Sequence, residues 1–367
     1  MSTTTIEQLG KLGQSVWLDY ISRSLMKSGR LKELIGLGVT GMTSNPTIFD
    51  KAINSGSDYD DHIRELHGMG KPLFEIYDDI TIKDIQTAAD TFRPIYERTK
   101  GLDGYVSLEI NPKLAYKTKE TIAEGTRLAE KVNRPNVMFK VPATDDGYGA
   151  ITALLAKGIN VNVTLIFSLE QYQKTAAAYL EGIAKLLQNT GDARSVRSVA
   201  SVFVSRIDTA VDNLLDQLPD KKEAASLKGT AAVANSNLIY REYAEIVSGD
   251  EFKPLEKQGA SVQRCLWGST GTKNPAYSDI KYMAELIAQD TVNTVPENTL
   301  EAFLDHGTAE ETITADADKA QGIIDSLPRL GIDINAVCAK LLEDGVIAFD
   351  KSFDSLLDAI EKKTRSM

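Results

Sequence analysis

Val137-Met138-Phe139-Lys140-Val141-Pro142-Ala143-Thr144 is a short apolar run that carries one lysine just before a proline. Apolar surroundings disfavour the charged ammonium form of a lysine side chain. An amine that is held neutral is a nucleophile and can form a Schiff base with a substrate carbonyl. The stretch therefore predicts a strand that ends at a reactive amine, Lys140.

Strand-like and helix-like segments alternate on both sides of this stretch. Short runs rich in β-branched and aromatic residues recur, and segments with apolar residues three and four positions apart lie between them. Eight such units predict an α/β fold, the (β/α)8 or TIM barrel. The expected strands are residues 15–19, 39–45, 105–109, the run that ends at Lys140, 160–166, 195–203, 263–268 and 291–295.

The chain is longer than the roughly 250 residues of a typical barrel, and the surplus is expected to be helical. Residues 47–103 are predicted to form an inserted helical layer, in which Thr81-Ile82-Lys83-Asp84 starts a helix as a capping box. Residues 334–365 are predicted to be extra C-terminal helices, whose apolar stripe from Val346 to Ile360 packs against the barrel. Because no linker separates these parts, residues 1–367 are expected to form a single domain.

The remaining apolar periodicities predict helices between the strands. A second capping box, Ser168-Leu169-Glu170-Gln171, is expected to start one of them. Residues 229–235 are interpreted as helix, and strand is the alternative because they contain threonine and valine. The other predicted helices span residues 21–37, 113–132, 147–157, 168–187, 208–218, 222–247 and 279–288.

Polar residues stand at the ends of seven predicted strands. Active sites of such barrels lie at the carboxyl ends of the strands, so these side chains are expected to converge on Lys140. In residues 160–166, alternate positions are polar, which places them on one face of the strand. The candidate site residues are Asp19, Thr43, Asn45, Glu109, Lys140, Asn162, Thr164, Ser201, Arg206, Ser269 and Lys273.

This set of residues suits a carbonyl substrate that carries a phosphate. Glu109 is positioned to exchange protons while a carbinolamine at Lys140 loses water, directly or through a water molecule. Asp19 is a candidate to take a proton from a substrate hydroxyl when a carbon–carbon bond breaks. Arg206 offers a bidentate grip on phosphate, and Lys273 a point charge.

Composition excludes several classes of partner and site. The net charge of −11 argues against nucleic acid and against an anionic membrane surface as partners. No apolar run is long enough to span a bilayer, and residues 1–5 do not resemble a signal peptide, so a cytoplasmic location is expected. The two cysteines are expected to be buried thiols, and the three histidines have no metal-ligand spacing, so no metal and no cofactor is predicted.

The chain resembles the transaldolase family, in its longer bacterial branch, over essentially its whole length. The matching stretches are residues 17–19, 43–46, 107–109, 139–144, 158–168 and 201–206, of which Thr43-Ser44-Asn45-Pro46 and residues 158–168 are specific together. The resemblance implies a metal-free transfer of dihydroxyacetone between sugar phosphates through a lysine Schiff base, in the pentose phosphate pathway.

The resemblance also implies a role for each site residue. Lys140 corresponds to the Schiff-base lysine, Glu109 with Thr164 holds the catalytic water, and Asp19 is the proton acceptor and donor. The dihydroxyacetone unit is bound by Asn45, with Thr43 in the same motif, and by Asn162 and Ser201. Phosphate is bound by Arg206 and Ser269, with Lys273 where shorter members carry an arginine. Phe203 favours transfer, because related aldolases carry a tyrosine there.

Other interpretations stay open. The same Schiff base serves an aldolase that releases free dihydroxyacetone, and a barrel of this kind can also be catalytically silent and serve in binding. Lys140 is otherwise a surface lysine, and Lys273 a solvated loop charge. The predicted partners are small sugar phosphates, and the protein is expected to be a monomer or a homodimer.

Overall fold

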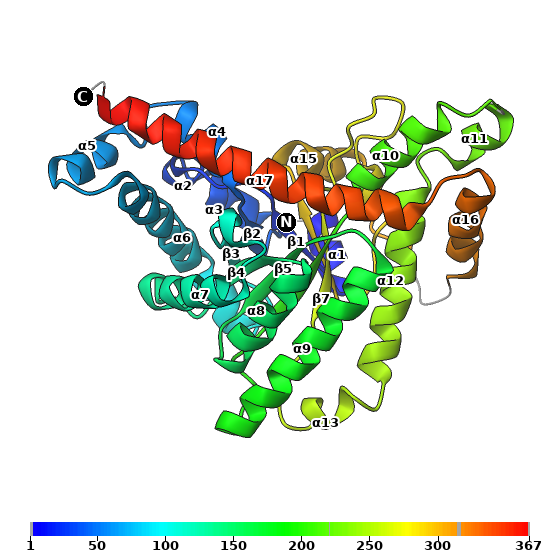
Figure 1. Ribbon diagram of the computed structural model, residues 1–367, viewed down its shortest axis with the longest axis horizontal. Coiled ribbons are helices and arrows are strands. Elements are labelled where there is room, and N and C mark those ends of the chain that lie inside the picture. Colours follow the sequence, from blue (N-terminus) through cyan, green and yellow to red (C-terminus); the bar gives the residue numbers. More distant parts are fainter. Residues whose placement is uncertain (1–2, 220, 314–316, 366–367) are drawn as a thin grey trace.

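The computed structural model describes residues 3–219, 221–313 and 317–365. The described residues form eight parallel strands that pair in chain order, and β1 pairs with β8 to close a barrel (Figure 1). The predicted TIM barrel is confirmed, and each predicted strand overlaps an observed one. The strands are β1 (Gln14–Leu18), β2 (Gly41–Thr43), β3 (Val106–Glu109), β4 (Val137–Pro142), β5 (Val161–Ile166), β6 (Ser198–Phe203), β7 (Arg264–Gly268) and β8 (Thr291–Val295).

Helices surround the barrel and also cover its carboxyl-terminal end. Helices α4, α5 and α6 lie between β2 and β3, where a helical insertion was expected, and α17 is the long helix drawn in red in Figure 1. The helices are α1 (Thr5–Lys11), α2 (Arg23–Lys27), α3 (Arg30–Gly36), α4 (Pro46–Asn54), α5 (Asp60–Gly68), α6 (Leu73–Arg98), the 3₁₀ helix η1 (Pro112–Leu114), α7 (Thr118–Val132), α8 (Asp145–Ala156), α9 (Leu169–Thr190), α10 (Ser205–Leu215), α11 (Lys221–Leu227), α12 (Ala231–Ser248), α13 (Lys253–Glu256), α14 (Lys281–Ala284), α15 (Glu297–His306), α16 (Asp318–Arg329) and α17 (Ile334–Arg365).

The inside of the barrel changes from apolar to polar along the strands. One cluster of buried side chains contains Trp17, Met138, Val199, Leu266 and Val292, all from strands. Successive side chains of a strand point to opposite faces, so the residue two positions further on points inward again. Those positions hold Asp19, Lys140, Ser201, Gly268 and Thr294. The barrel therefore has an apolar floor, and its polar layer lies on the side where the active sites of such barrels are found.

The opposite end of the barrel is closed by a buried ion pair. Arg264 donates to a carboxylate oxygen of Asp103 at 3.1 Å and to the hydroxyl of Ser15 at 2.8 Å. Asp103 also accepts hydrogen bonds from Ser15 and from the indole of Trp17, so both of its oxygens have partners. These contacts join β1 to β7 below the apolar floor, at the end of the barrel opposite to the polar layer.

Several helix boundaries differ from the sequence prediction. The single helix expected over residues 21–37 is broken into α2 and α3 at Gly29, whose φ of +85° is left-handed. The helix expected over residues 222–247 is broken at Gly229, which also has a positive φ. Residues 231–235 are helical, as interpreted, but 229 and 230 precede the helix. Glycine tolerates such backbone angles, so it ends a helix where periodicity alone continues it.

Residues 279–288 form only the short helix α14. The backbone of Ile287 pairs with Thr312 and Ile313 instead of continuing the helix. Its N–H also donates to the hydroxyl of Thr312 at 3.0 Å. A contact with residues 312–313 therefore replaces the local helical hydrogen bonds. The apolar periodicity of residues 279–288 does not reveal this contact.

The capping box predicted at Thr81 is wrong. Thr81 lies inside α6, and its hydroxyl donates to the backbone oxygens of Tyr77 and Asp78 at 3.0 and 3.1 Å. A threonine inside a helix often bonds back to the preceding turn, so the same four-residue pattern occurs in both settings. The capping box at Ser168 is confirmed at the start of α9. The Ser168 hydroxyl accepts the backbone N–H of Gln171, and the side-chain oxygen of Gln171 accepts the backbone N–H of Ser168.

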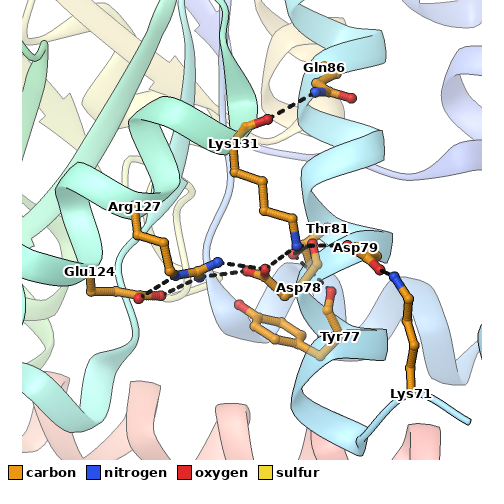
Figure 2. Close-up of polar contacts among 9 residues, drawn as sticks. All are labelled: Lys71, Tyr77, Asp78, Asp79, Thr81, Gln86, Glu124, Arg127 and Lys131. Carbon is orange, nitrogen blue, oxygen red and sulfur yellow. Dashed lines mark hydrogen bonds and ion pairs between the residues drawn. The ribbon is translucent and has the colours of Figure 1, made fainter.

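An ion-pair network joins the inserted helix α6 to α7 (Figure 2). Asp78 is buried and accepts two hydrogen bonds of 2.8 Å from the guanidinium of Arg127. Lys131 bridges Asp78 and Asp79 at 2.6 and 2.7 Å. Burial alone raises the pKa of Asp78, but these hydrogen bonds outweigh burial and the pKa lies below its ordinary value. The network fixes the insertion against the barrel's outer layer.

Among the residues that the structure describes, no helix is both long and apolar enough to cross a membrane.

Candidate active site

The amine of Lys140 is buried at the polar end of the barrel. Its Nζ donates to the backbone oxygen of Ser44 at 3.0 Å and lies 3.6 Å from Oε2 of Glu109. Both side chains are about 5% exposed. Strand register explains the pairing, because Glu109 and Lys140 are partners in the β3–β4 ladder and Asn162 is the partner of Lys140 in β5. A nucleophile and a carboxylate therefore face each other in a space that excludes bulk water.

Burial of Glu109 raises the pKa of its carboxyl to about 7, and the nearby charge of Lys140 opposes this rise. Within the described part of the chain, its Oε2 has no hydrogen-bond partner, and neither has the buried hydroxyl of Thr164 on β5. A carboxyl whose pKa lies near neutrality both accepts and donates protons efficiently. Glu109 therefore has the environment of an acid–base group.

Asp19 and Thr43 line the same cavity as Lys140. The hydroxyl of Thr43 is 2.7 Å from Oδ1 of Asp19 and 2.6 Å from the hydroxyl of Thr294 on β8. Burial raises the pKa of Asp19, while Lys140, Thr43 and Arg206, in that order, act to lower it. The carboxyl of Asp19 is thus held beside the amine but retains a raised affinity for a proton.

Asn162 is fixed by hydrogen bonds within the barrel. Its amide nitrogen donates to the hydroxyl of Ser107 at 3.0 Å, and its oxygen accepts from Ser201 at 2.6 Å. Asn45 is held differently, because it is the N-cap of α4 and its oxygen accepts the N–H of Ile48 at 3.0 Å. The amide nitrogen of Asn45 bonds to no other described residue, so it is available to a ligand.

Two residues at the strand ends have left-handed backbone angles that are unfavourable for side chains other than glycine. Leu165, with a φ of +61°, lies where the β5–β6 register shifts, and Ser269, with a φ of +54°, follows β7. Such strain costs of order 1–3 kcal/mol per residue and is concentrated at functional sites. The β5 irregularity directly follows Thr164, and the turn at Ser269 brings its hydroxyl within 3.1 Å of Ser205.

Arg206 provides a cation at the edge of this group. Its guanidinium lies 5.4 Å from the centre of the Phe203 ring and has neither an ion pair nor a hydrogen bond to any other described residue. Desolvation lowers the pKa of Arg206, and the charge of Asp19 opposes this. A partly buried guanidinium without a protein partner is suited to an anionic ligand. The cavity that contains it is lined by Asp19, Thr43, Asn45, Lys140, Ser201, Phe203, Arg206, Leu266, Gly268, Ser269, Thr294 and Phe349.

Lys273 is the one predicted site residue that faces elsewhere. It is exposed and lines a neighbouring hollow together with Asp212 and Tyr277. Partial desolvation and, second, the positive charge of Arg206 lower its pKa, so the two cations are near each other. Lys273 therefore lines a hollow next to the site cavity and is not in the cavity wall.

A model of the transaldolase/fructose-6-phosphate aldolase family matches residues 16–360 of the chain. The chain belongs to this family. It is 45% identical to a transaldolase of Saccharopolyspora erythraea, over 99% of this chain and 98% of that protein, and 46% identical to a transaldolase of Thermobifida fusca, over 98% of each. A transaldolase of Trichodesmium erythraeum is 42% identical over 100% of this chain and 99% of the relative.

Family membership confirms the resemblance seen in the sequence, and the chain is an enzyme of a transferase family. The individual roles of the site residues remain predictions. Asp19, Thr43, Asn45, Lys140, Ser201, Arg206 and Ser269 line one cavity, Glu109 contacts Lys140, and Asn162 contacts Ser201. The described residues contain no group of three or more histidine, cysteine, aspartate or glutamate side chains arranged to hold a metal ion.

Several members of the site were not among the residues predicted from the sequence. Ser44 contributes its backbone oxygen, which no side-chain pattern reveals. Thr294 was detectable, because it occupies the inward parity of the last predicted strand. Phe349 lies on α17, far along the chain from every strand. Its apolar stripe signalled only that the helix packs against the barrel.

Proposed function

We propose that the protein is a class I transaldolase, which moves a dihydroxyacetone unit from a ketose phosphate to an aldose phosphate through a Schiff base on Lys140. The proposed donors are sedoheptulose 7-phosphate and fructose 6-phosphate, and the acceptors are glyceraldehyde 3-phosphate and erythrose 4-phosphate, as in the pentose phosphate pathway. The observation that carries this proposal is the buried contact between Lys140 Nζ and Glu109 Oε2 at the polar end of the barrel.

The first step is addition of Nζ to the ketose carbonyl carbon. The carbonyl oxygen takes up a proton to give a carbinolamine, which then loses water and leaves a protonated Schiff base. Glu109 supplies and removes the protons, through a water held between its Oε2 and the Thr164 hydroxyl. Support comes from the raised pKa of Glu109 and from the two buried oxygens, which have no hydrogen-bond partner among the described residues.

The second step breaks a carbon–carbon bond. Asp19 takes the proton of the donor hydroxyl next to that bond, the aldose leaves as a new carbonyl, and the bonding electrons move to the Schiff-base nitrogen to give an enamine. Reaction with the acceptor aldehyde reverses these movements, and hydrolysis of the Schiff base releases the new ketose. Asn45, Asn162 and Ser201 bind the retained hydroxyls, and Arg206 with Ser269 binds phosphate.

Product analysis tests the proposal. Incubation with fructose 6-phosphate and erythrose 4-phosphate should yield sedoheptulose 7-phosphate and glyceraldehyde 3-phosphate. Fructose 6-phosphate alone should yield at most one turnover of glyceraldehyde 3-phosphate per site, apart from slow hydrolysis. Sustained release of free dihydroxyacetone without an acceptor would instead identify an aldolase. A cytoplasmic location and small sugar phosphates as partners belong to the same proposal.

A further inference from the structure

Helix α17 crosses the carboxyl-terminal end of the barrel (Figure 1). One of its aromatic residues, Phe349, lines the site cavity. Phe349 is 4% exposed and lines the same cavity as Lys140 and Asp19. One turn earlier, Gly345 lets the helix approach closely, because a Cβ there would be 2.9 Å from the side chain of Leu165 and 3.6 Å from the Arg206 guanidinium. The helix therefore lies directly against residues that border the site.

Both halves of α17 are anchored to elements that carry site residues. Near its start, the thiol of Cys338 donates to the backbone oxygen of Phe167, just beyond β5. Further along, Ser352 is 2.8 Å from the hydroxyl of Thr47, and Ser355 donates to Asp50 at 3.1 Å. Thr47 and Asp50 belong to α4, whose N-cap is Asn45. The position of Phe349 over the cavity is thus fixed from two sides.

We propose that Phe349 is a specificity-determining residue, whose ring excludes water from the enamine and so favours transfer to an aldehyde over hydrolysis. This inference rests on the proposed function. Without an acceptor, the enamine carbon can take up a proton to give the iminium ion. Water oxygen then bonds to the iminium carbon and loses both of its protons, one of them to Nζ, as the carbon–nitrogen bond breaks and the amine leaves. The products are dihydroxyacetone and free Lys140.

The composition of the cavity supports this role. Phe203, Leu266 and Phe349 are its large apolar members, and Phe349 is the one that no strand supplies. Removing its ring would open a path from the α17 side toward Lys140 while leaving every polar group of the strands in place. The ring therefore affects the competition between water and aldehyde more than it affects Schiff-base formation.

The chain offers a matched control on the same helix. Phe353 lies one turn after Phe349, is equally buried, and packs edge-on against Tyr77 of α6 with ring centres 5.1 Å apart. It does not line the site cavity. Phe349→Ala and Phe353→Ala thus both remove a buried ring from α17, but only the first changes the wall of the site.

The test measures, for the full-length protein, the rate of dihydroxyacetone release from fructose 6-phosphate without acceptor, divided by the rate of transfer to erythrose 4-phosphate. Phe349→Ala should raise this ratio by about tenfold or more, since a tenfold change needs only a modest change in barrier. Borohydride should still trap the adduct on Lys140. Phe353→Ala should lower the melting temperature and leave the ratio at the wild-type value.

An unchanged ratio in Phe349→Ala, or an equal rise in Phe353→Ala, would overturn the inference. If Phe349→Ala does not unfold cooperatively, Phe349→Leu is measured in its place, because leucine keeps most of the side-chain volume. A rise of about threefold is then expected, and no rise refutes the inference. Absence of an adduct in the wild-type protein would instead refute the proposed function, so the two failures are distinguishable.

Discussion

The Oε2 atom of Glu109 lies 3.6 Å from the Nζ atom of Lys140, and the two residues are register partners in neighbouring strands. Both are buried; burial raises the pKa of Glu109, and the charge of Lys140 opposes that rise. The contact places a nucleophile and an acid–base group at paired positions of β3 and β4. The predictions below test this pair and the residues around it.

Replacing Lys140 by alanine should abolish transfer and preserve the fold. The side chain lies at a strand end, and Glu109 is left to be protonated instead of remaining as an unpaired buried charge. Transfer should fall by at least about a thousandfold. Thermal unfolding at a slightly acidic pH should remain cooperative. Loss of that transition would show that Lys140 is mainly structural.

Glu109→Gln should change how stability depends on pH. The native pKa of Glu109 is raised from its ordinary 4.5 to about 7, so the native state binds more protons than the unfolded state within that window. The free energy of unfolding therefore decreases as pH rises through the window. Glutamine removes this contribution, so the variant should gain stability relative to wild type between about pH 5 and pH 8.

Urea unfolding of the variant and the wild type at about pH 5 and about pH 8 measures the gain. An equal difference in the free energy of unfolding at the two pH values would contradict the raised pKa of Glu109. The transfer rate gives an independent readout. Its pH profile should lose the limb near neutrality in the variant, because the group that titrates there is gone.

Arg206→Gln should weaken substrate binding more than Lys273→Gln. Arg206 lines the cavity, whereas Lys273 is exposed and lines a neighbouring hollow. Loss of a charged hydrogen-bonding partner costs about 2 kcal/mol, or roughly a 30-fold rise in the Michaelis constant for fructose 6-phosphate. Lys273→Gln should raise it less than about threefold. The reverse order would place the phosphate at Lys273.

Asp78→Asn should destabilise the protein through the α6–α7 network. Asp78 is buried, whereas Arg127 and Lys131 are each 38% exposed, so solvent screening reduces the loss to about 1–2 kcal/mol. Because the pKa of Asp78 is depressed below 3.8, its contribution is present above that pH and is lost as pH falls through the native pKa.

Denaturant unfolding at neutral pH measures this effect. Asp90→Asn is the matched control, since Asp90 also lies on α6 and pairs with Arg134 at a more exposed position. It should cost less than about 0.5 kcal/mol. Equal costs for the two variants would mean that burial of Asp78 contributes nothing.

The strands and the polar layer were predictable because both follow from local rules. Strand periodicity of two separates inward from outward residues, and the carboxyl ends of parallel strands meet at one end of a barrel. Asp19, Glu109, Lys140 and Asn162 could therefore be assigned to one site before the structure was known. Because the strands pair in chain order around a closed barrel, the strands that lie beside each of these residues also follow from the prediction.

Two kinds of feature were not predictable in the same way: local patterns that suit more than one structure, and contacts between segments distant in the sequence. The hydroxyl of Thr81 bonds back within a helix that begins upstream, although its sequence pattern equally suits a helix start. The backbone of Ile287 pairs with Thr312, and Phe349 reaches the cavity only because α17 folds across the barrel. Lys273 lines a neighbouring hollow and not the site cavity, which its place in the loop after β7 does not reveal.

The most direct test of the central claim is borohydride reduction in the presence of fructose 6-phosphate, followed by peptide mass mapping. One reduced dihydroxyacetone adduct is expected, on the peptide that contains Lys140, and none in Lys140→Ala. An adduct on another lysine, or no adduct in a folded wild-type protein, would contradict it.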